Sequence, residues 1–199
     1  MQNQLFLLIL FIIIGYLSGS IPFGYLIGKL KNVDVRKKGS GNIGGTNVAR
    51  TLGFKYGVLV GVLDILKAII PIYIAGKYLT QDWQMALISI SPVLGHIFPV
   101  WLRFKGGKGV ATVAATIFMI LGLKYSLIFL AIWILSLFTL KIMSLTNLII
   151  ILSLPVLFWM QTKSSAYVVL AFVYILLIWW AHRENIKRLR QGIEPKIIK

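Results

Sequence analysis

The sequence predicts an all-α, polytopic integral membrane protein with about seven transmembrane helices, the N-terminus outside and the C-terminus cytoplasmic. Two observations predict this class. The chain is 58% hydrophobic with a mean hydropathy of +0.87, and its polar residues gather between long apolar runs. Soluble domains are about 45–50% apolar, and a soluble fold of 199 residues cannot hide the excess from water. The length favours a single membrane-embedded domain, 1–199.

Seven apolar runs, each bounded by charged, glycine or polar residues, are the candidate spans. A transmembrane helix perpendicular to the bilayer needs about 20 residues, with a range of about 17–25. The fourth, fifth and sixth runs are short, so five or six spans remain open alternatives. The runs cover residues 5–27, 56–75, 84–102, 110–123, 125–140, 145–160 and 166–181.

The distribution of Lys and Arg predicts the orientation. The net charge is +16, and the charges fall between apolar runs, which favours membrane topology over nucleic-acid binding. With the N-terminus outside, only Lys77, Lys124 and Lys163 lie in outer loops, and Lys67 lies inside the second run. All other cations are then cytoplasmic, as the positive-inside rule requires. The long polar segments share that side, so we expect the active site to face the cytoplasm.

Several kinds of chemistry are excluded or disfavoured. The chain has no cysteine, which rules out disulfides, thiol catalysis and cysteine metal sites. It has two histidines, too few to favour a zinc site. We therefore expect no metal and no cofactor. The first four residues carry no cationic side chain, so the first run is interpreted as a retained helix rather than a signal peptide.

The first cytoplasmic segment, 34–50, is rich in glycine and ends in Arg50. Glycines let the backbone turn and expose successive N–H groups, an arrangement that binds anions. Arg50 can offer a two-pronged contact to phosphate. Phosphate binding is favoured over the alternative, a flexible basic loop that touches lipid headgroups. The glycines and polar residues concerned are Gly39, Ser40, Gly41, Asn42, Gly44, Gly45, Thr46 and Asn47.

The second segment places Gly106, Gly107 and Gly109 around Lys108, just before an apolar run. A glycine turn that leads into a helix N-terminus is a ready anion site. The spacing of a Walker A loop is absent, so nothing implies ATP. The alternative is a tight basic turn between two spans. His96 lies near the inner end of the third run, where a lone histidine is more often structural than catalytic.

Three polar residues elsewhere are further candidates. His182 and Asn185 are three residues apart and share a face if the segment is helical. Two alternatives stay open for these two residues: they point into a site, or they belong to a basic helix end that anchors on lipid. For Lys187, Arg188 and Arg190, anchoring is favoured. Ser144 opens the sixth run, where it caps the helix or contacts a ligand.

Asp64 and Lys67 lie inside the second run, where isolated charges are costly. Their spacing of three residues allows them to pair on one helix face. A structural ion pair is favoured, with a supporting role near the site as the alternative.

The whole chain resembles one known family through six segments in a fixed order. They are residues 19–24 (GSIPFG), 39–50 (GSGNIGGTNVAR), 95–96 (GH), 98–99 (FP), 104–112 (FKGGKGVAT) and 182–185 (HREN). This set resembles the bacterial acyl-phosphate:glycerol-3-phosphate acyltransferases (PlsY family). The resemblance implies a seven-helix enzyme of the bacterial cytoplasmic (inner) membrane.

The resemblance also implies the reaction, which is transfer of a fatty acyl group from acyl phosphate to the 1-hydroxyl of glycerol 3-phosphate. The products are lysophosphatidate and inorganic phosphate, in the first acylation of phospholipid synthesis. The expected partners are these two substrates and membrane lipids, with no nucleic acid, and the expected state is a monomer.

Candidate roles follow for both loops and the tail. Ser40, Arg50, Lys108, His182 and Asn185 are the predicted catalytic residues. We expect direct attack without a covalent intermediate, with the hydroxyl proton passing to an oxygen of the acyl phosphate; His182 or His96 as base is the alternative. The backbone N–H groups of Gly106 and Gly107 are expected to face a phosphate. The predicted substrate-binding residues are Gly41, Asn42, Thr46, His96, Gly106, Gly107 and Ser144.

Other functions fit the residues less well. A transporter for an anionic metabolite needs polar residues along a path to the outer face, which is nearly bare of them. A lipid-docking scaffold gives no reason for the clustered glycines. A phosphatidyl transferase would want paired acidic residues for Mg²⁺, and the 5 Asp+Glu of this chain are scattered.

Overall fold

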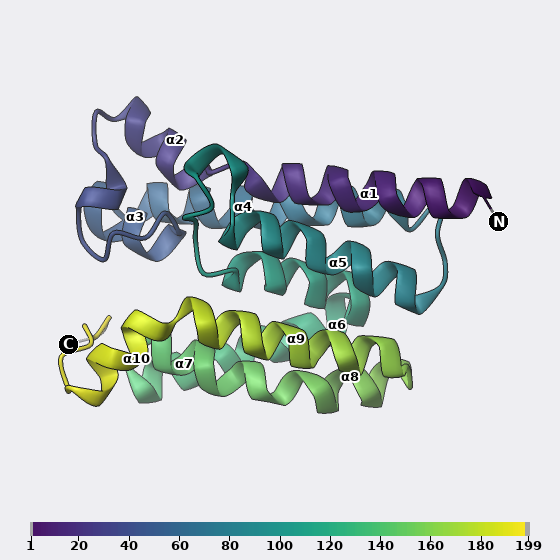
Figure 1. The fold of residues 1–199 in the computed structure, drawn as a ribbon. Coiled ribbons are helices and arrows are strands. Elements are labelled where there is room, and N and C mark those ends of the chain that lie inside the picture. Colours follow the sequence, from purple (N-terminus) through teal and green to yellow (C-terminus); the bar gives the residue numbers. More distant parts are fainter. Residues whose placement is uncertain (1, 198–199) are drawn as a thin grey trace. The chain divides into compact units, whose positions relative to one another are not determined.

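The structure is a computed structural model that describes residues 2–197, in which every regular element is a helix (Figure 1). The predicted all-α class is therefore confirmed. The chain divides into two compact units, Met1–Thr116 and Ile117–Lys199. Each unit is described by itself. The single membrane-embedded domain expected from the length stays a prediction.

The first unit is built on three long helices that contact one another: α1 (Gln2–Ser20), α4 (Phe54–Ala75) and α5 (Asp82–Ile97) (Figure 1). Shorter elements lie between α1 and α4 and after α5. These are α2 (Phe23–Leu30), α3 (Gly45–Leu52) and the 3₁₀ turns η1 (Val35–Lys37) and η2 (Val100–Leu102). The glycine-rich segments of the sequence are the connections between these elements.

Glycines let α1 and α5 approach each other closely. Gly15 and Gly19 are four residues apart on α1, the small-residue spacing that allows membrane helices to pack backbone to backbone. A Cβ atom at Gly19 would lie 2.2 Å from the carbonyl oxygen of Pro92 on α5. On the opposite side of the contact, a Cβ at Gly95 would lie 2.2 Å from the carbonyl oxygen of Tyr16. Larger residues at these positions would force the two helices apart.

The contact between α3 and α4 is made in the same way. A Cβ at Gly45 would lie 2.6 Å from the carbonyl oxygen of Gly57, and a Cβ at Gly57 would lie 2.5 Å from the Cβ of Ala49. A small apolar cluster seals this end of the unit. Its buried members are Val35, Ile43, Val48 and Val60, and Leu102 of η2 is among the residues packed against them. The first glycine loop and the start of the second therefore share one core.

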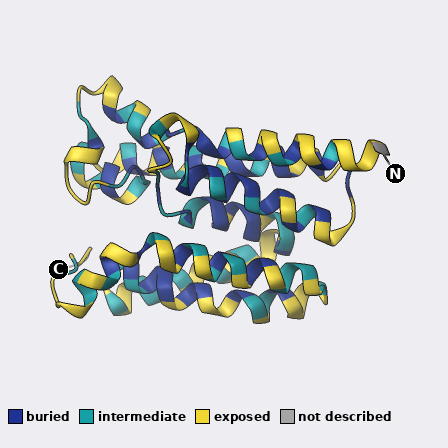
Figure 2. Cartoon of the chain, viewed as in Figure 1, coloured by how far each residue is buried: buried dark blue, intermediate teal, exposed yellow. Residues whose placement is uncertain are grey.

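Much of the apolar surface of the first unit is exposed, as in a helix that faces lipid. Along α1, Leu5, Phe6 and Ile13 are each more than half exposed. Exposed and buried residues alternate along the helices in Figure 2, and the exposed ones include large apolar side chains. Apolar exposure on this scale would be unfavourable in water but is expected in a bilayer.

The second unit contains most of α6 (Val110–Leu140), which begins in the first unit. It continues with α7 (Met143–Ile150), the 3₁₀ turn η3 (Ile151–Ser153) and α8 (Leu154–Thr162). It ends with α9 (Ser165–Ala181) and α10 (Arg183–Arg190), which are bent by 62° relative to each other at His182. The tail after α10 turns back at Gly192, which has a positive φ of 69°.

The structure confirms that the chain has several helices able to span a membrane, but not that it has seven. Among the described residues, five helical segments are long and apolar enough to cross a membrane, or six if the bent pair of α9 and α10 is one span. The fourth and fifth predicted runs both fall within α6. Gly122 has non-helical backbone angles there (φ 73°, ψ 179°), so α6 is two helices joined at a kink. Seven spans and the predicted orientation of the termini stay predictions.

The close contact at Gly57 makes a stability prediction with a matched control in the same helix. Gly57→Ala should lower the free energy of unfolding by about 1–3 kcal/mol because the added methyl overpacks the α3–α4 contact. Gly61→Ala adds the same methyl where no atom lies within 4 Å. It should be neutral or stabilise the helix by up to about 1 kcal/mol. Thermal unfolding of both variants in detergent measures the difference, and equal effects would contradict the packing argument.

Candidate functional site

One buried amide side chain, that of Asn47, holds the first glycine loop in shape. Its backbone lies in α3, and the residue is 2% exposed. The side-chain Nδ2 donates to the carbonyl oxygens of Val35 (2.9 Å), Lys38 (3.1 Å) and Asn42 (2.8 Å). The side-chain Oδ1 accepts from the N–H of Ser40 at 2.7 Å. Loop residues from 35 to 42 are thereby tied to the helix that follows them.

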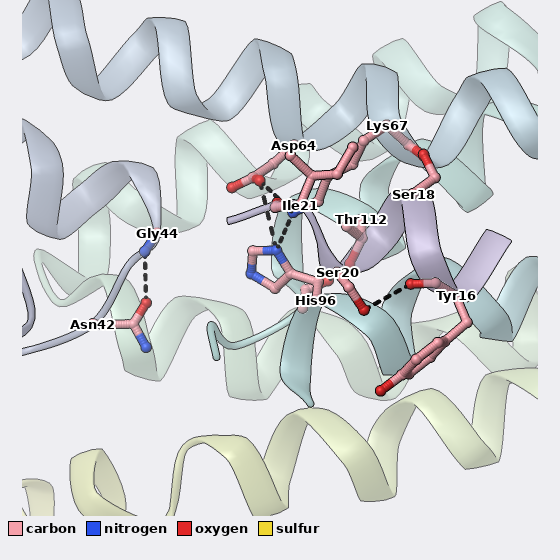
Figure 3. Close-up of polar contacts among 11 residues, drawn as sticks. Tyr16, Ser18, Ser20, Ile21, Asn42, Gly44, Asp64, Lys67, His96 and Thr112 are labelled. Atoms are coloured by element: carbon pink, nitrogen blue, oxygen red, sulfur yellow. Dashed lines mark hydrogen bonds and ion pairs between the residues drawn. The ribbon is translucent and has the colours of Figure 1, made fainter. Parts of the chain in front are cut away.

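Asn42 and Asp34 also stabilise the loop from within. The Oδ1 of Asn42 accepts from the N–H of Gly44 at 2.8 Å, just before α3 begins (Figure 3). Asp34 accepts from the backbone and side chain of Arg36, with 2.8 Å between its Oδ2 and the guanidinium Nη2. This hydrogen bonding from Arg36 lowers the pKa of Asp34 to about 2. Asn42, predicted to bind substrate, thus has a structural contact in this structure.

The remaining polar groups of the first loop are exposed. Ser40, Gly41, Thr46 and Arg50 all have exposed side chains or backbone. Thr46 and Arg50 are four residues apart on α3 and therefore lie on one helix face. Among the described residues, the Arg50 side chain makes no hydrogen bond or ion pair. A guanidinium and hydroxyls presented this way suit an anionic ligand.

The second glycine loop corrects one expectation. The N–H of Gly107 donates to the carbonyl oxygen of His96 at 2.9 Å, and the N–H of Gly106 donates to that of Ile97 at 3.1 Å. Both N–H groups are therefore used to fold the loop back onto the end of α5, and they do not face a phosphate in this structure. The glycines are needed for another reason. A Cβ at Gly106 would lie 2.2 Å from the carbonyl oxygen of His96.

Lys108 stands at the turn into α6. It is partly buried and lies between Gly107 and Gly109, whose positive φ of 82° completes the turn. The hydroxyl of Thr112 donates to the carbonyl oxygen of Gly109 at 2.9 Å, which stabilises the first turn of α6. The prediction of a glycine turn leading into a helix is therefore confirmed, and Lys108 is the cationic residue within that turn.

Behind the second loop, three titratable groups form a buried cluster (Figure 3). Lys67 and Asp64 on α4 pair at 2.7 Å with side chains that are 2% and 3% exposed. The predicted ion pair is therefore confirmed. His96 on α5 joins it, with 3.0 Å between its Nδ1 and the Lys67 Nζ. Lys67 also donates to the carbonyl oxygen of Ile21, between α1 and α2, at 2.7 Å.

In the second unit, polar side chains converge on one carboxylate, that of Glu194 in the tail. Ser144 donates to its Oε1 at 2.7 Å, and Asn185 donates to the same oxygen. Arg188 donates to its Oε2 at 2.7 Å. Burial of Glu194 would raise its pKa, but hydrogen bonds from Asn185, Ser144 and Arg188 together lower it. The Glu194 carboxylate thus links Ser144 and Asn185, which are 41 positions apart in the sequence (144 and 185).

His182 is placed differently from Asn185, although both are buried. Its side chain is fully buried at the bend between α9 and α10, and its Nδ1 lies 2.8 Å from the carbonyl oxygen of Ile178. A carbonyl oxygen only accepts, so Nδ1 carries a proton in that contact. The structure therefore holds His182 to its own helix, while it holds Asn185 to the tail.

Sequence reasoning missed Glu194 and assigned Arg188 to lipid anchoring. The structure adds a contact for Arg188, whose guanidinium pairs with Glu194, and its lipid anchoring stays a prediction. The capping role considered for Ser144 is also not met, since its hydroxyl donates to Glu194 and α7 has no side-chain cap. One signal was available in the sequence. Gly192 lets the chain reverse after a helix of cations, and Glu194 just beyond it pairs with one of them, Arg188.

Comparison with known proteins decides the family. A family model described as glycerol-3-phosphate acyltransferase matches residues 9–192. The chain belongs to the glycerol-3-phosphate acyltransferase family. A relative from Prochlorococcus marinus (strain NATL1A), named glycerol-3-phosphate acyltransferase, is 41% identical over 197 residues, covering 96% of this chain and 98% of the relative. A relative of the same name from Aquifex aeolicus (strain VF5) is 41% identical over 186 residues, covering 93% and 96%.

Two solved structures support the same assignment at the level of the fold. The chain matches the glycerol 3-phosphate form of PlsY, an integral membrane glycerol 3-phosphate acyltransferase, with a TM-score of 0.89 and 40% identity over 96% of this chain and 95% of that one. The lysophosphatidic acid form matches with a TM-score of 0.86 and 40% identity, over 95% and 94%. The family resemblance predicted from the sequence is therefore confirmed, and so is a multi-pass membrane fold.

The Glu194 contacts predict a specific pH dependence of stability. A carboxylate with a lowered pKa in the folded state contributes stability that is present above its usual value of 4.5 and is lost as the pH falls through the lowered value. Glu194→Gln should therefore flatten the loss of thermal stability on the acid side. It should also destabilise at neutral pH, since hydrogen bonds to charged groups are worth about 1.5–3 kcal/mol.

Glu184→Gln is the matched control, because Glu184 pairs with Lys187 at an exposed site where ion pairs contribute little. Its pH profile of thermal unfolding should follow that of the unmodified protein. An acid limb that is equally steep with and without Glu194 would show that this carboxylate is not linked to folding.

Proposed function

We propose that this protein transfers a fatty acyl group from acyl phosphate to the 1-hydroxyl of glycerol 3-phosphate, giving lysophosphatidate and inorganic phosphate. The observation that carries the proposal is the full-length similarity to PlsY in its glycerol 3-phosphate and lysophosphatidic acid forms. One ligand of that pair is the acceptor and the other is the acylated product. The donor, acyl phosphate, is proposed from the sequence resemblance.

In this proposal the first unit binds phosphate. Ser40, Thr46 and Arg50 are exposed on the first loop and α3, and Lys108 stands on the second loop. Arginine and lysine next to hydroxyl donors suit the doubly charged phosphates of both substrates. Gly41 shapes the first loop with its positive φ of 72°, and Gly106 and Gly107 shape the second by close contact. His96 acts on substrate through the second loop, against which it packs.

The proposal also assigns roles to neutral polar side chains. His182 and Asn185 orient glycerol 3-phosphate or polarise the reacting carbonyl, and Ser144 assists them. Glu194 fixes the side chains of Asn185 and Ser144 by accepting their hydrogen bonds. The ring of His182, which acts on the substrate in this proposal, is held in place at the bend after α9. Positioning and charge stabilisation, rather than a covalent intermediate, then account for the rate.

The bond changes are those of direct acyl transfer. The 1-hydroxyl oxygen attacks the acyl carbonyl carbon, forming the ester C–O bond. The bond between that carbon and the phosphate oxygen breaks, and inorganic phosphate leaves with the electron pair. The hydroxyl proton passes to an oxygen of the departing phosphate, so the balance needs no cofactor.

The proposal places the enzyme in the bacterial cytoplasmic membrane as a monomer, with the reacting groups at the cytoplasmic surface. Acyl phosphate carries a long apolar chain and a charged head, so it partitions with its chain among lipids and its phosphate at the interface. The bias of Lys and Arg toward one side supports this orientation.

A donor comparison tests the reaction. The purified protein is given glycerol 3-phosphate with acyl phosphate, acyl-CoA or acyl-carrier protein in turn. We expect lysophosphatidate and inorganic phosphate in equal amounts from acyl phosphate and no lysophosphatidate from the other donors. Transfer from acyl-CoA without phosphate release would overturn the proposed donor, and failure to acylate with any donor would overturn the proposed function.

Substitution of the two cations tests the phosphate contacts. Arg50→Ala and Lys108→Ala should each lower activity at least about tenfold, because charged hydrogen bonds are worth about 1.5–3 kcal/mol. Lys105→Ala, three positions before Lys108 on the same loop, is the control and should stay near the activity of the unmodified protein. Steady-state kinetics on variants with unchanged thermal unfolding make the comparison, and full activity of either variant removes that cation from the site.

A further inference from the structure

We propose that Lys67 is a positioning residue. Its buried ammonium fixes both the tautomer and the place of the His96 ring, and that ring holds the turn that carries Lys108. The proposal deepens the proposed function and rests on it only for the role of Lys108 in binding phosphate.

The ammonium of Lys67 has three polar partners, one in an ion pair and two in hydrogen bonds. They are Asp64 Oδ1 at 2.7 Å, the Ile21 carbonyl oxygen at 2.7 Å and His96 Nδ1 at 3.0 Å. A lysine ammonium donates three hydrogen bonds and accepts none. These partners come from α4, the α1–α2 connection and α5, so one charge joins three parts of the first unit (Figure 3).

This arrangement fixes where His96 carries its proton. Since the ammonium can only donate, Nδ1 of His96 must be the acceptor and the neutral ring is protonated on Nε2. The competing arrangement, in which Nδ1–H donates to Asp64, is disfavoured by distance. His96 Nδ1 lies 3.6 Å from Asp64 Oδ1, which is too long for a hydrogen bond.

The protonated edge of the ring lies against the second loop. A Cβ at Gly107 would be 1.9 Å from His96 Nε2 and 2.7 Å from Cε1, so the ring occupies the space that a side chain would need. The backbone adds two restraints, from Gly107 to the His96 carbonyl oxygen at 2.9 Å and from Gly106 to that of Ile97 at 3.1 Å. A ring that swings away from Lys67 would therefore move Gly107 and the adjacent Lys108.

The placement of the proton is tested first, by nitrogen NMR of protein labelled with ¹⁵N-histidine in lipid. The chain has two histidines, and His182→Gln leaves only the signals of His96. We expect one neutral tautomer with the proton on Nε2 and a hydrogen-bonded, unprotonated Nδ1. A proton on Nδ1 would overturn the proposal, and this measurement does not depend on catalysis.

The positioning role is tested by removing the ammonium without leaving a buried carboxylate unpaired. In the double variant Asp64→Asn, Lys67→Met, we expect mixed tautomers of His96. We also expect a KM for at least one phosphorylated substrate raised about tenfold or more, since a displacement of about 1 Å can cost up to a hundredfold. Ser18→Ala is the control, because the Ser18 hydroxyl bonds the carbonyl oxygen of Lys67 at 2.7 Å and leaves the ammonium untouched.

The outcomes separate this inference from the proposed function. If the double variant keeps its thermal stability and both KM values are unchanged, Lys67 does not position the loop. If the variant fails to fold, the His96 spectrum of the Lys67-containing protein decides, together with Gly107→Ala, which should shift the ring signals by displacing the ring. If no donor yields lysophosphatidate, the proposed function fails while the His96 spectrum still tests the placement.

Discussion

A charge buried among apolar helices must find all its partners inside the protein, because a bilayer offers none. Lys67 meets this requirement with a carboxylate, a backbone carbonyl and a ring nitrogen drawn from separate elements. The carbonyl is that of Ile21, where the chain passes from α1 into α2, and the ring is that of His96 at the end of α5. The cluster therefore stands between the long helices of the first unit and the loops that follow them.

Close glycine contacts complete this frame. Van der Waals packing drives association of helices in a bilayer, and small residues allow it at backbone distance. Gly19 and Gly95 bring α1 and α5 together, while Gly45 and Gly57 bring α3 against α4. The same residue type serves a different purpose at Gly107, where it makes room for an imidazole. Glycine-rich loops in this chain are therefore packing surfaces as much as flexible turns.

Sequence patterns predicted the features that depend on local spacing. The apolar runs, the ion pair of Asp64 with Lys67 and the glycine turn into α6 follow from composition and from helical periodicity. Patterns could not show which donors are already used within the fold. The N–H groups of Gly106 and Gly107 were expected to face a ligand, but their partners are carbonyls of α5. The pairing of Glu194 with Ser144, Asn185 and Arg188 depends on a chain reversal between distant segments, which periodicity does not encode.

Burial separates two groups of polar residues that cannot be told apart from the sequence. Asn47 is buried, and its side-chain amide hydrogen-bonds to the loop backbone. Thr46 and Arg50, on the same short helix, are exposed. In the second unit, Ser144 and Asn185 are buried and share a carboxylate. The Asn47 amide, already bonded to three loop carbonyls, would gain little by exchanging them for a ligand, since the net value of a hydrogen bond is about 1 kcal/mol. Among the residues that the structure describes, the exposed Arg50 guanidinium makes no hydrogen bond or ion pair, so it would give up no such contact on binding an anion.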